Sequence, residues 1–318
     1  MQNISIRQLR AILAIHSKGK IVSAAKELGL TGPAVTLQLK QVEDAVGMSL
    51  FDRTGDGMRL TAAGMAVLVA ADTVEESLRT LADTIDALRG VRLGSLRLGV
   101  VSTAKYFAPR IISAFLKQHP GIEVSLSVGN REQTIESLRR HDVDIALMGR
   151  PPRDISVRSA VFGDHPLVIV APADHPLAKV LDISKEMLAQ EKFIVREAGS
   201  GTRISLELFF ATVPEKLEGL GTVMESNETI KQSVIAGLGI AFISAHTVEQ
   251  ELNLGSLVIL DVAGMPIRRQ WFSVSRSDRQ ETPAIKAFND FLIRKGPALL
   301  PIIGKPYPEA AFGDKNHS

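Results

Sequence analysis

Apolar residues recur at helical spacing in three stretches near the start of the chain. The stretches 9–16, 21–28 and 32–42 each gather apolar side chains on one face, so three helices are predicted. Gly19 and Gly29 end the first two helices, because glycine readily adopts the left-handed conformation found at helix ends. A three-residue turn between the second and third helices is typical of a helix-turn-helix.

Small side chains and a glycine-containing hairpin sharpen this prediction. Ala25 lets another helix cross closely, and Thr31 is a good N-cap for the third helix. Residues 49–54 and 58–61 flank the sequence Gly-Asp-Gly at 55–57, which predicts a tight hairpin, the wing of a winged helix-turn-helix. The alternative is a small helical domain whose alanines merely pack.

In a helix-turn-helix the second helix enters the major groove, so its outward side chains are the candidate DNA contacts. Gln38 can read a base edge, Lys40 can meet a phosphate, and Arg53 beside the hairpin can clamp the DNA backbone. Residues 1–60 hold eight basic and five acidic residues, a modest excess that suits an anionic partner. The candidate DNA-binding residues are Thr31, Gly32, Pro33, Ala34, Thr36, Leu37, Gln38, Lys40 and Arg53.

A proline-free stretch, residues 62–89, carries apolar residues at alternating spacings of four and three. This heptad pattern predicts one helix, about 42 Å long, that pairs with a second copy of the chain. We expect a homodimer that pairs further into a homotetramer; a helix packed only on its own domain is the alternative. The apolar positions are Val67, Ala71, Val74, Leu78, Leu81, Ile85 and Leu88.

After Gly90 the pattern changes to alternating strands and helices, which predicts an α/β domain with a mostly parallel sheet. Two such lobes joined by a double crossover form a cleft between strand ends, where open sheets bind ligands. Strands are expected at 95–101, 122–128, 143–148, 166–171, 192–195, 221–224, 239–243 and 268–275, and helices at 104–118, 131–140, from 203, from 227 and at 283–294.

Four predicted helix starts on the expected cleft side carry small polar residues, at 101–104, 128–131, 199–203 and 226–229. Free N–H groups and the helix dipole favour anions at such ends, so the set predicts phosphate or carboxylate recognition. Each one alone is an ordinary N-cap or turn, and their number favours the ligand site. The candidate effector-binding residues are Ser102, Thr103, Asn130, Arg131, Gly149, Arg150, Arg196, Ser200, Gly201, Thr202, Arg203, Asn227 and Lys231.

Composition narrows the function further. The 318 residues include no cysteine, and the seven histidines show no helical pairing, so neither a metal nor a cofactor is expected. Without a long apolar run or a signal peptide, a soluble cytoplasmic protein with no membrane partner is expected. Asp164-His165 suggests acid/base chemistry, but turn formation by Asp and Pro is the ordinary explanation there and at His175. No nucleophile elbow or Walker A loop is present, so an enzyme is not expected.

The N-terminal residues resemble the LysR-type regulators. The matching positions are Ala24 and Ala25, residues 30–36 (Leu-Thr-Gly-Pro-Ala-Val-Thr), Gln38, Glu43, Gly47, residues 50–53 (Leu-Phe-Asp-Arg) and residues 60–64. The resemblance implies a winged helix-turn-helix that binds a dyad-symmetric promoter site in double-stranded DNA. Gly32 replaces the usual Gln, and Leu37 replaces a frequent Arg. Specificity is therefore expected to depend on Thr36, Gln38, apolar contacts to thymine methyls and DNA shape.

The remaining chain resembles the same family, whose effector domain has a periplasmic-binding-protein-like fold, so the resemblance covers nearly all of residues 1–295. A narrower resemblance, to the regulators of the Calvin-cycle (RuBisCO) operons, implies an effector such as ribulose bisphosphate, phosphoenolpyruvate or NADPH. It is carried by residues 98–109, 128–132, 148–152, 196–203, 226–232 and 236–248.

We therefore expect a winged helix-turn-helix over 1–61, a dimerisation helix over 62–90 and an effector-binding domain over 91–295, followed by a tail over 296–318. Within the effector domain, lobe I comprises 91–162 and 268–295, and lobe II comprises 163–267. The expected function is that of a transcription regulator that responds to a small anionic metabolite. We expect it to be an activator. A two-lobed small-molecule-binding protein or enzyme on the same fold is the alternative.

Overall fold

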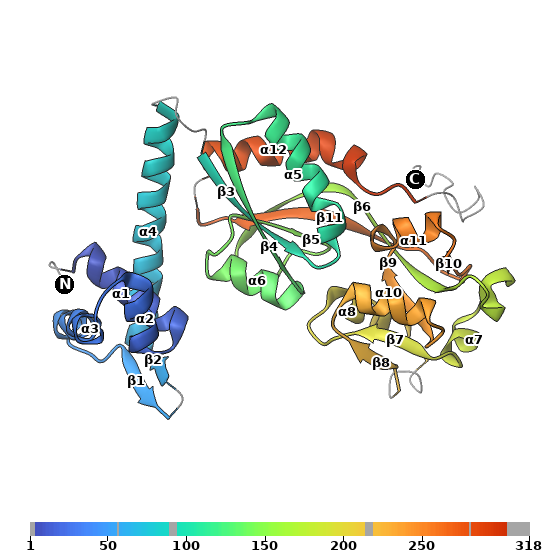
Figure 1. Cartoon of the computed structure of the whole chain (residues 1–318), viewed down its shortest axis with the longest axis horizontal. Helices are drawn as coiled ribbons and strands as arrows, with labels where there is room; N and C mark the ends of the chain where they lie inside the picture. Colours follow the sequence, from blue (N-terminus) through green and yellow to red (C-terminus); the bar gives the residue numbers. More distant parts are fainter. Residues whose placement is uncertain (1–3, 56, 89–93, 214–218, 280, 304–318) are drawn as a thin grey trace. The chain divides into compact units, whose positions relative to one another are not determined.

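A computed structural model describes residues 4–55, 57–88, 94–213, 219–279 and 281–303 (Figure 1). The chain divides into two compact units, Met1–Gly90 and Val91–Ser318, which are considered separately below. No described helix is long and apolar enough to cross a membrane.

The first unit contains the predicted three helices and hairpin. Its elements are α1 (Ile6–Lys18), α2 (Ile21–Leu28), α3 (Gly32–Val46), β1 (Phe51–Thr54), β2 (Gly57–Leu60) and α4 (Ala62–Leu88). Gly19 and Gly29 end α1 and α2 with φ angles of 68° and 64°, in the left-handed region where glycine carries no Cβ penalty. The two strands pair antiparallel, with Phe51 opposite Leu60. Asp56 of the predicted hairpin turn lies outside the described residues.

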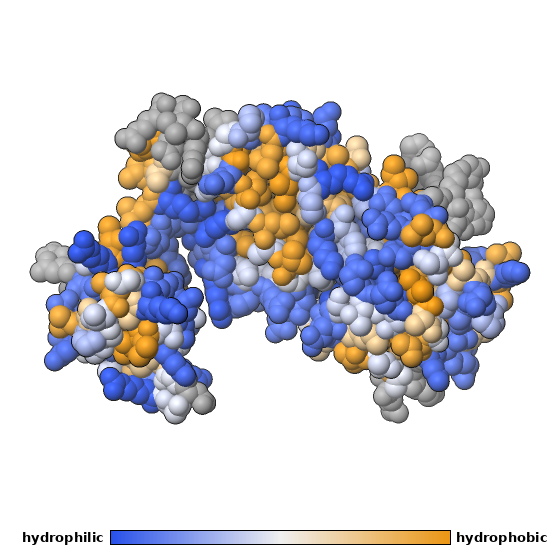
Figure 2. Space-filling view, viewed as in Figure 1, coloured by the Kyte–Doolittle hydropathy of each residue, from blue (hydrophilic) through white to orange (hydrophobic). Residues whose placement is uncertain are grey.

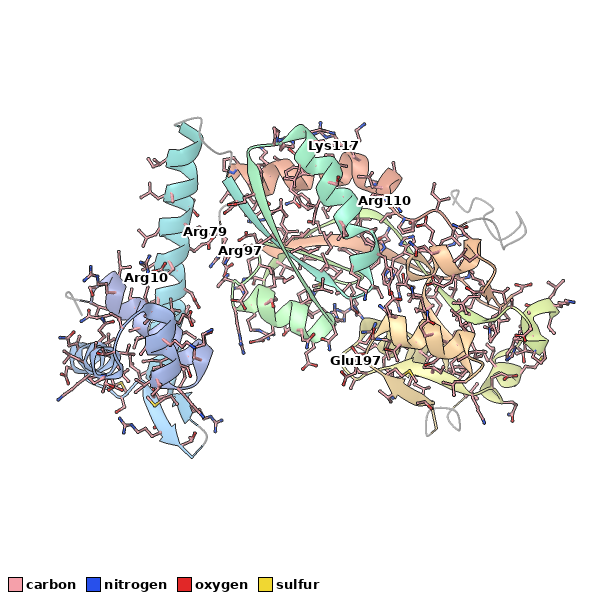
Figure 3. The ribbon with its side chains drawn as sticks, viewed as in Figure 1. Arg10, Arg79, Arg97, Arg110, Lys117 and Glu197 are labelled. Carbon is pink, nitrogen blue, oxygen red and sulfur yellow. The ribbon has the colours of Figure 1, made fainter. Side chains whose placement is uncertain are left out.

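The heptad seam of α4 falls into two parts with different surroundings. Near its start the helix packs against α1, Ala71 is buried, and Arg10 of α1 forms an ion pair with Glu75 at 2.6 Å (Figure 3). Further along, Leu81 and Ile85 are 57% and 38% exposed, and hydrophobic surface is visible along the helix (Figure 2). The side chain of Leu88 lies outside the described part of the chain. The early seam thus stabilises its own unit, and the later seam leaves an apolar surface uncovered.

The second unit is an α/β domain with two lobes, as predicted. In lobe I, β3 (Gly94–Val101) pairs in parallel with β4 (Ile122–Gly129) and β5 (Ile145–Met148). Helices α5 (Ala108–Gln118) and α12 (Pro283–Leu299) pack together beside this sheet, while α6 (Arg131–Arg139) contacts its strands (Figure 1). A short 3₁₀ turn at Ala104–Tyr106 precedes α5, so the helix expected at 104–118 is interrupted at Phe107.

Lobe II repeats the strand and helix alternation around a second core. Here β7 (Phe193–Arg196) pairs in parallel with β8 (Thr222–Met224) and β9 (Ile240–Ser244). Its other elements are α7 (Lys185–Ala189), α8 (Gly201–Phe209), α10 (Asn227–Ile235), α11 (Glu249–Asn253), β10 (Leu257–Ile259), and 3₁₀ turns at Pro176–Lys179 and Ala245–Thr247. Helices α8 and α10 both contact β7 and β9, so the lobe's core lies between helices and sheet.

Two long strands connect the lobes. Strand β6 (Val157–Pro172) pairs antiparallel with β11 (Ile267–Arg276), and between them they join the two sets of strands into one sheet of nine. The strand expected at 166–171 therefore begins nine residues earlier, at Val157. The turn expected at Asp164-His165 is wrong, because both residues lie inside β6. Pro166 is tolerated there because pairing with β9 begins only at Leu167, so no β9 partner requires its missing N–H.

His175 shows the turn that His165 does not. It precedes the 3₁₀ turn Pro176–Lys179, and its Nδ1 accepts a hydrogen bond from the backbone N–H of Leu177 at 3.2 Å. At the other end of the unit, α12 continues to Leu299, so residues 296–299 of the expected tail are helical. Residues 304–318 lie outside the described part.

Candidate functional site: a recognition helix and an arginine-lined cavity

The candidate DNA-binding residues lie at the start of α3 and on the wing. Thr31 caps α3, its Oγ1 accepting from the N–H of Ala34 at 3.4 Å. Pro33, Thr36, Leu37, Lys40 and Arg53 are exposed, whereas Gly32, Ala34 and Gln38 are half-buried. The structure thus presents a surface with two cationic side chains, Lys40 and Arg53, and a mainly apolar centre.

Two polar side chains of α3 are less available to a base edge than their sequence positions predict. The Thr36 hydroxyl donates to the carbonyl of Gly32 at 3.0 Å, one turn earlier on the helix. Gln38 keeps its Oε1 buried, without a protein hydrogen-bond partner in the described structure. Leu37, by contrast, is 56% exposed, and Val22 of α2 is 78% exposed. Apolar contacts therefore outweigh hydrogen-bonding groups on this surface.

Hydrogen bonds and a close backbone approach fix the wing against the helices. Glu43 of α3 accepts from the N–H of Leu50 at 2.8 Å, and Thr61 donates to the carbonyl of Ser49 at the same distance. At Gly64 of α4 an added Cβ would lie 2.0 Å from the carbonyl oxygen of Leu50, so only glycine fits. The family-like residues Glu43, Thr61 and Gly64 therefore position Arg53 by holding the hairpin that carries it.

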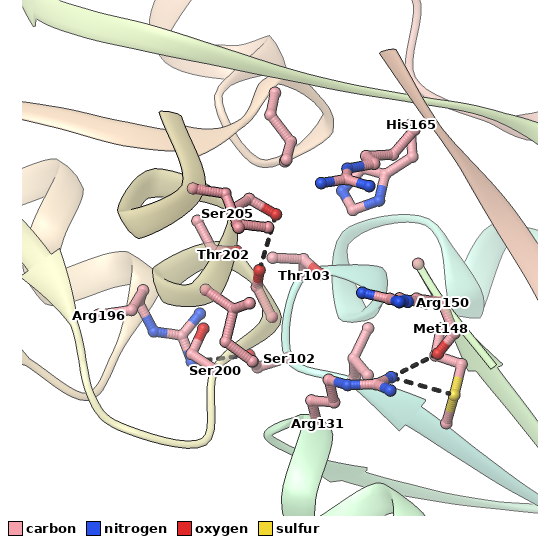
Figure 4. A pocket seen from close by; sticks show the side chains of 17 residues that line it. Ser102, Thr103, Arg131, Met148, Arg150, His165, Arg196, Ser200, Thr202 and Ser205 are labelled. Carbon is pink, nitrogen blue, oxygen red and sulfur yellow. Dashed lines mark hydrogen bonds between the residues drawn. The ribbon is translucent and has the colours of Figure 1, made fainter. Parts of the chain in front are cut away.

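In the second unit, a cavity lies between the lobes (Figure 4). The space between its lining residues is about 720 Å³, a figure that includes the open mouth. Nine candidate effector-binding residues line it, namely Ser102, Thr103, Arg131, Gly149, Arg150, Arg196, Ser200, Gly201 and Thr202. The structure therefore brings together residues from three of the four predicted helix starts and from the end of β5.

Charge is the main property of this cavity. Four arginines line it, Arg131, Arg150, Arg196 and Arg269, and in the described structure no Asp or Glu does. Arg131 is directed to main-chain carbonyls, donating to those of Arg150 and Pro151. The pKa of Arg131 is lowered by burial and by the neighbouring charge of Arg150, so an anion placed here would relieve an electrostatic cost.

Arg196 differs from the other arginines because its charge is already neutralised. It is only 2% exposed and forms two hydrogen bonds with the carboxylate of Glu197, at 2.7 and 2.8 Å (Figure 3). It also donates to Asn227 at 2.8 Å and to the Ser102 hydroxyl at 3.0 Å. Asn227 donates to the carbonyl of Ser102 at 3.3 Å, so both residues of lobe II hold a loop of lobe I.

Backbone groups add to the anion-binding potential. Ser200 is the N-cap of α8, and its side chain makes no capping hydrogen bond. The first N–H groups of a helix have no intrahelical partner, and the helix dipole gives this end a partial positive charge. Since Ser200, Gly201 and Thr202 all line the cavity, the start of α8 faces the same space as the arginines.

Four candidate effector-binding residues, Asn130, Arg203, Asn227 and Lys231, do not line the cavity. Asn130 caps α6 and is bonded to Gln133, and Arg203 pairs with Glu207 at 2.7 Å. Lys231 is buried and pairs with Glu251 at 2.7 Å. Sequence reasoning located the helix starts but could not tell which side chains would instead be taken up by local partners.

Several lining residues were not predicted, and His165 and Arg269 are the polar ones of most interest. They lie opposite each other on β6 and β11. His165 stacks on Trp271 with ring centroids 3.8 Å apart, and the indole N–H of Trp271 donates to Nδ1 of His246 at 3.0 Å. Burial lowers the pKa of His165 well below its ordinary value and that of His246 to about 4. A sequence signal existed, since Arg269 and Trp271, two apart, share one face of a strand.

Comparison with known proteins identifies the class. Residues 6–65 match the bacterial regulatory helix-turn-helix of the lysR family, and residues 89–297 match the LysR substrate-binding domain. The chain belongs to the LysR family of DNA-binding transcription regulators, a family of regulators rather than enzymes. The surface on α3 lies in the part of the chain that matches the helix-turn-helix, and the cavity lies in the part that matches the substrate-binding domain.

Individual relatives narrow the comparison. The chain is 61% identical over 313 residues to the HTH-type transcriptional regulator CbbR of Rhizobium meliloti, covering 98% of this chain and 100% of that protein. It is 44% identical to the RuBisCO operon transcriptional regulator of Allochromatium vinosum, covering 92% of this chain and 96% of that one. Among solved structures, the Synechocystis PCC6803 CcmR regulatory domain in complex with 2-PG is 38% identical, with a TM-score of 0.58, covering 63% of this chain and 96% of that one. The resemblance to regulators of RuBisCO operons is thereby confirmed.

Proposed function

We propose that this regulator controls genes of carbon fixation in response to a small anionic metabolite bound in the arginine-lined cavity. Support for the target genes comes from the two relatives named for CbbR and the RuBisCO operon. Support for the ligand class comes from the cavity itself. A dimer or tetramer holds several recognition helices on a dyad-symmetric site, and ligand binding changes the arrangement of the lobes.

One observation carries the ligand class: four guanidinium groups and no carboxylate line the described cavity. Of the four, only Arg196 has a carboxylate partner at ion-pair distance in the described structure, and Asp154 acts on Arg131 without forming an ion pair, so the lining keeps a net positive charge. A carboxylate or phosphate accepts the planar pair of N–H groups that arginine offers. A neutral or cationic ligand would leave these charges without a partner.

The oligomer is proposed from the later part of the α4 seam. Leu81 and Ile85 are exposed one turn apart on α4, and a heptad repeat stabilises a helix only when a second helix covers it. A second copy of the chain supplies such a helix by symmetry. Half-site spacing on DNA then depends on how the copies are arranged.

The ligand class is tested by a thermal-shift screen of the full chain. The compounds are ribulose bisphosphate, phosphoenolpyruvate, NADPH and the 2-PG found with CcmR. We expect at least one to raise the unfolding temperature in a concentration-dependent way, because a ligand that binds only the folded state stabilises it. R150A should lose this shift, since Arg150 lines the cavity.

R153A is the matched control. Arg153 follows closely in the same loop and is exposed, but it does not line the cavity, so its removal changes the net charge equally without touching the site. Equal loss of the shift in both variants would contradict a local role for the cavity. Absence of any shift with every compound would contradict the proposed ligand class.

A further inference from the structure

The two crossing strands bring unpartnered polar atoms to the cavity wall. Arg269 of β11 lies directly opposite His165 of β6 in the antiparallel register, and both line the cavity. In the described structure, both ring nitrogens of His165 and Nε of Arg269 are buried without a protein hydrogen-bond partner. Buried polar groups nearly always have a partner, so three such atoms in one place require an explanation.

The surroundings of His165 hold its ring in a fixed orientation. The ring stacks on Trp271 at an interplanar angle of 17°, and Trp271 is itself anchored by its hydrogen bond to His246. On the other side Gly149 leaves the necessary room, since an added Cβ there would lie 2.8 Å from Nδ1 of His165. His165 is 7% exposed, and Figure 4 shows it facing the cavity at the opposite end from Arg131.

The chemistry of the two groups indicates what they bind. A neutral imidazole has one N–H donor, and the Nε of Arg269 is a second donor that is always charged. Burial, then the nearby His246 and then Arg269 lower the pKa of His165, which keeps the ring neutral. The N–H of this ring and the Nε of Arg269 both lack a hydrogen-bond acceptor, and beside a guanidinium an anionic oxygen is favoured.

We propose that His165 and Arg269 form a distinct subsite of the cavity that binds an anionic oxygen of the effector. This inference rests on the proposed function, because it assigns one end of the same ligand; Arg131 and Arg150 then bind the other end. A ligand held by His165 and Arg269 is attached to the two strands that run between the lobes. The subsite therefore connects ligand binding directly to the lobe arrangement.

Two substitutions separate this role from a merely structural one. H165F keeps an aromatic ring stacked on Trp271 and removes both ring nitrogens. R269Q removes the guanidinium. R268Q is the matched control, because Arg268 precedes Arg269 on the same strand but is exposed on the opposite face.

The experiment is calorimetric titration of the full chain and its variants with ribulose bisphosphate and with phosphoenolpyruvate. We expect H165F and R269Q each to weaken binding by at least about tenfold, the usual loss for a hydrogen bond to a charged group, and R268Q to bind like the wild type. The unfolding temperature of H165F without ligand should equal or exceed that of the wild type, because the two unpartnered ring nitrogens are removed. If His165 had only a structural role, H165F would lower the unfolding temperature without ligand and leave ligand affinity unchanged.

The fluorescence of Trp271 gives a second readout. The chain has one tryptophan, which stacks on His165, so binding at the subsite should change its emission in the wild type and not in H165F. If H165F does not fold, H165L and R269Q provide the same comparison. The subsite would be overturned if a folded His165 variant and R269Q both bind with wild-type affinity. If R150A loses binding in the same experiment, the proposed function stays intact. No binding of either probe to the wild type would overturn both.

Discussion

The DNA-binding surface and the effector cavity recognise their targets with opposite kinds of side chain. On α3 the hydroxyl of Thr36 is bonded to the carbonyl of Gly32, the side-chain oxygen of Gln38 is buried, and Leu37 is 56% exposed. In the cavity, four arginines and a helix N-terminus converge without a carboxylate in the described lining. The cavity can select its ligand by local charge, whereas the DNA surface has few groups that read a base directly.

This difference indicates which interactions must supply the sequence specificity of DNA binding. A single recognition helix with few hydrogen-bonding groups discriminates weakly among base pairs, so thymine methyl contacts, DNA shape and the spacing of repeated helices carry more of the selection. A ligand that alters the spacing then acts on the main source of specificity. In the proposed function, the chemically selective site would thereby control the chemically less selective one.

The largest expected effect tests whether the two units are independent. G64A places a Cβ 2.0 Å from the carbonyl oxygen of Leu50, so overpacking should cost about 3 kcal/mol or more and abolish DNA binding. Ligand affinity, measured by calorimetry, should stay at the wild-type value because the cavity belongs to the other unit. G55A serves as control, since nothing lies within 4 Å of its added Cβ and Gly55 is not among the candidate DNA contacts. Joint loss of DNA and ligand binding in G64A would show that the units depend on each other.

The next largest effect is a loss of stability at acid pH, confined to the second unit. Burial lowers the pKa of His246 from 6.5 to about 4, so the unfolded chain takes up a proton between these values that the folded chain does not. Stability from this group is complete above pH 6.5 and falls by roughly 3 kcal/mol as the pH drops to about 4. Urea unfolding followed by the fluorescence of Trp271 reports this unit alone. H246Q, which keeps an acceptor for the indole, should reduce the pH dependence without abolishing it, because burial also lowers the pKa of His165. An unchanged slope would assign the pH dependence to groups other than His246.

The smallest effect concerns the DNA surface. K40A and R53A should each weaken binding to operator and to unrelated DNA by the same factor, about threefold to tenfold, because phosphate contacts carry no sequence information. Each should also lower the slope of log affinity against log salt by about 1. Fluorescence anisotropy at several salt concentrations measures both quantities. K117A, in the second unit, is the charge-matched control. A loss restricted to the operator would mean that these side chains read bases.

Most of the fold follows from local pattern, and the exceptions have identifiable causes. Glycine stops and helical periodicity define α1 to α3, where the structure agrees with the prediction. The first half of β6 was missed because Asp164, His165 and Pro166 have the composition of a turn, and only the pairing with β11 makes them a strand. Nothing local to the sequence reveals such a long-range pairing.

The side chains of the cavity, too, could be predicted only where the signal is local in the sequence. The small polar helix starts identify Ser102, Ser200 and Thr202, since a free helix end is a local property. Asn130, Arg203 and Lys231 were expected beside them, but each has a nearer partner that only packing determines. His165 and Arg269 gain their importance from facing each other across two strands about a hundred residues apart.

The way lobe I is completed has a consequence for synthesis in the cell. Its sheet includes β11, and α12 packs against its β3 and α5, so the lobe needs residues near both ends of the second unit. The first unit needs only residues up to Gly90. Because domains fold as units while the chain emerges from the ribosome, a folded DNA-binding unit exists before the ligand cavity can close. During translation, the DNA-binding unit is complete before the metabolite can be bound.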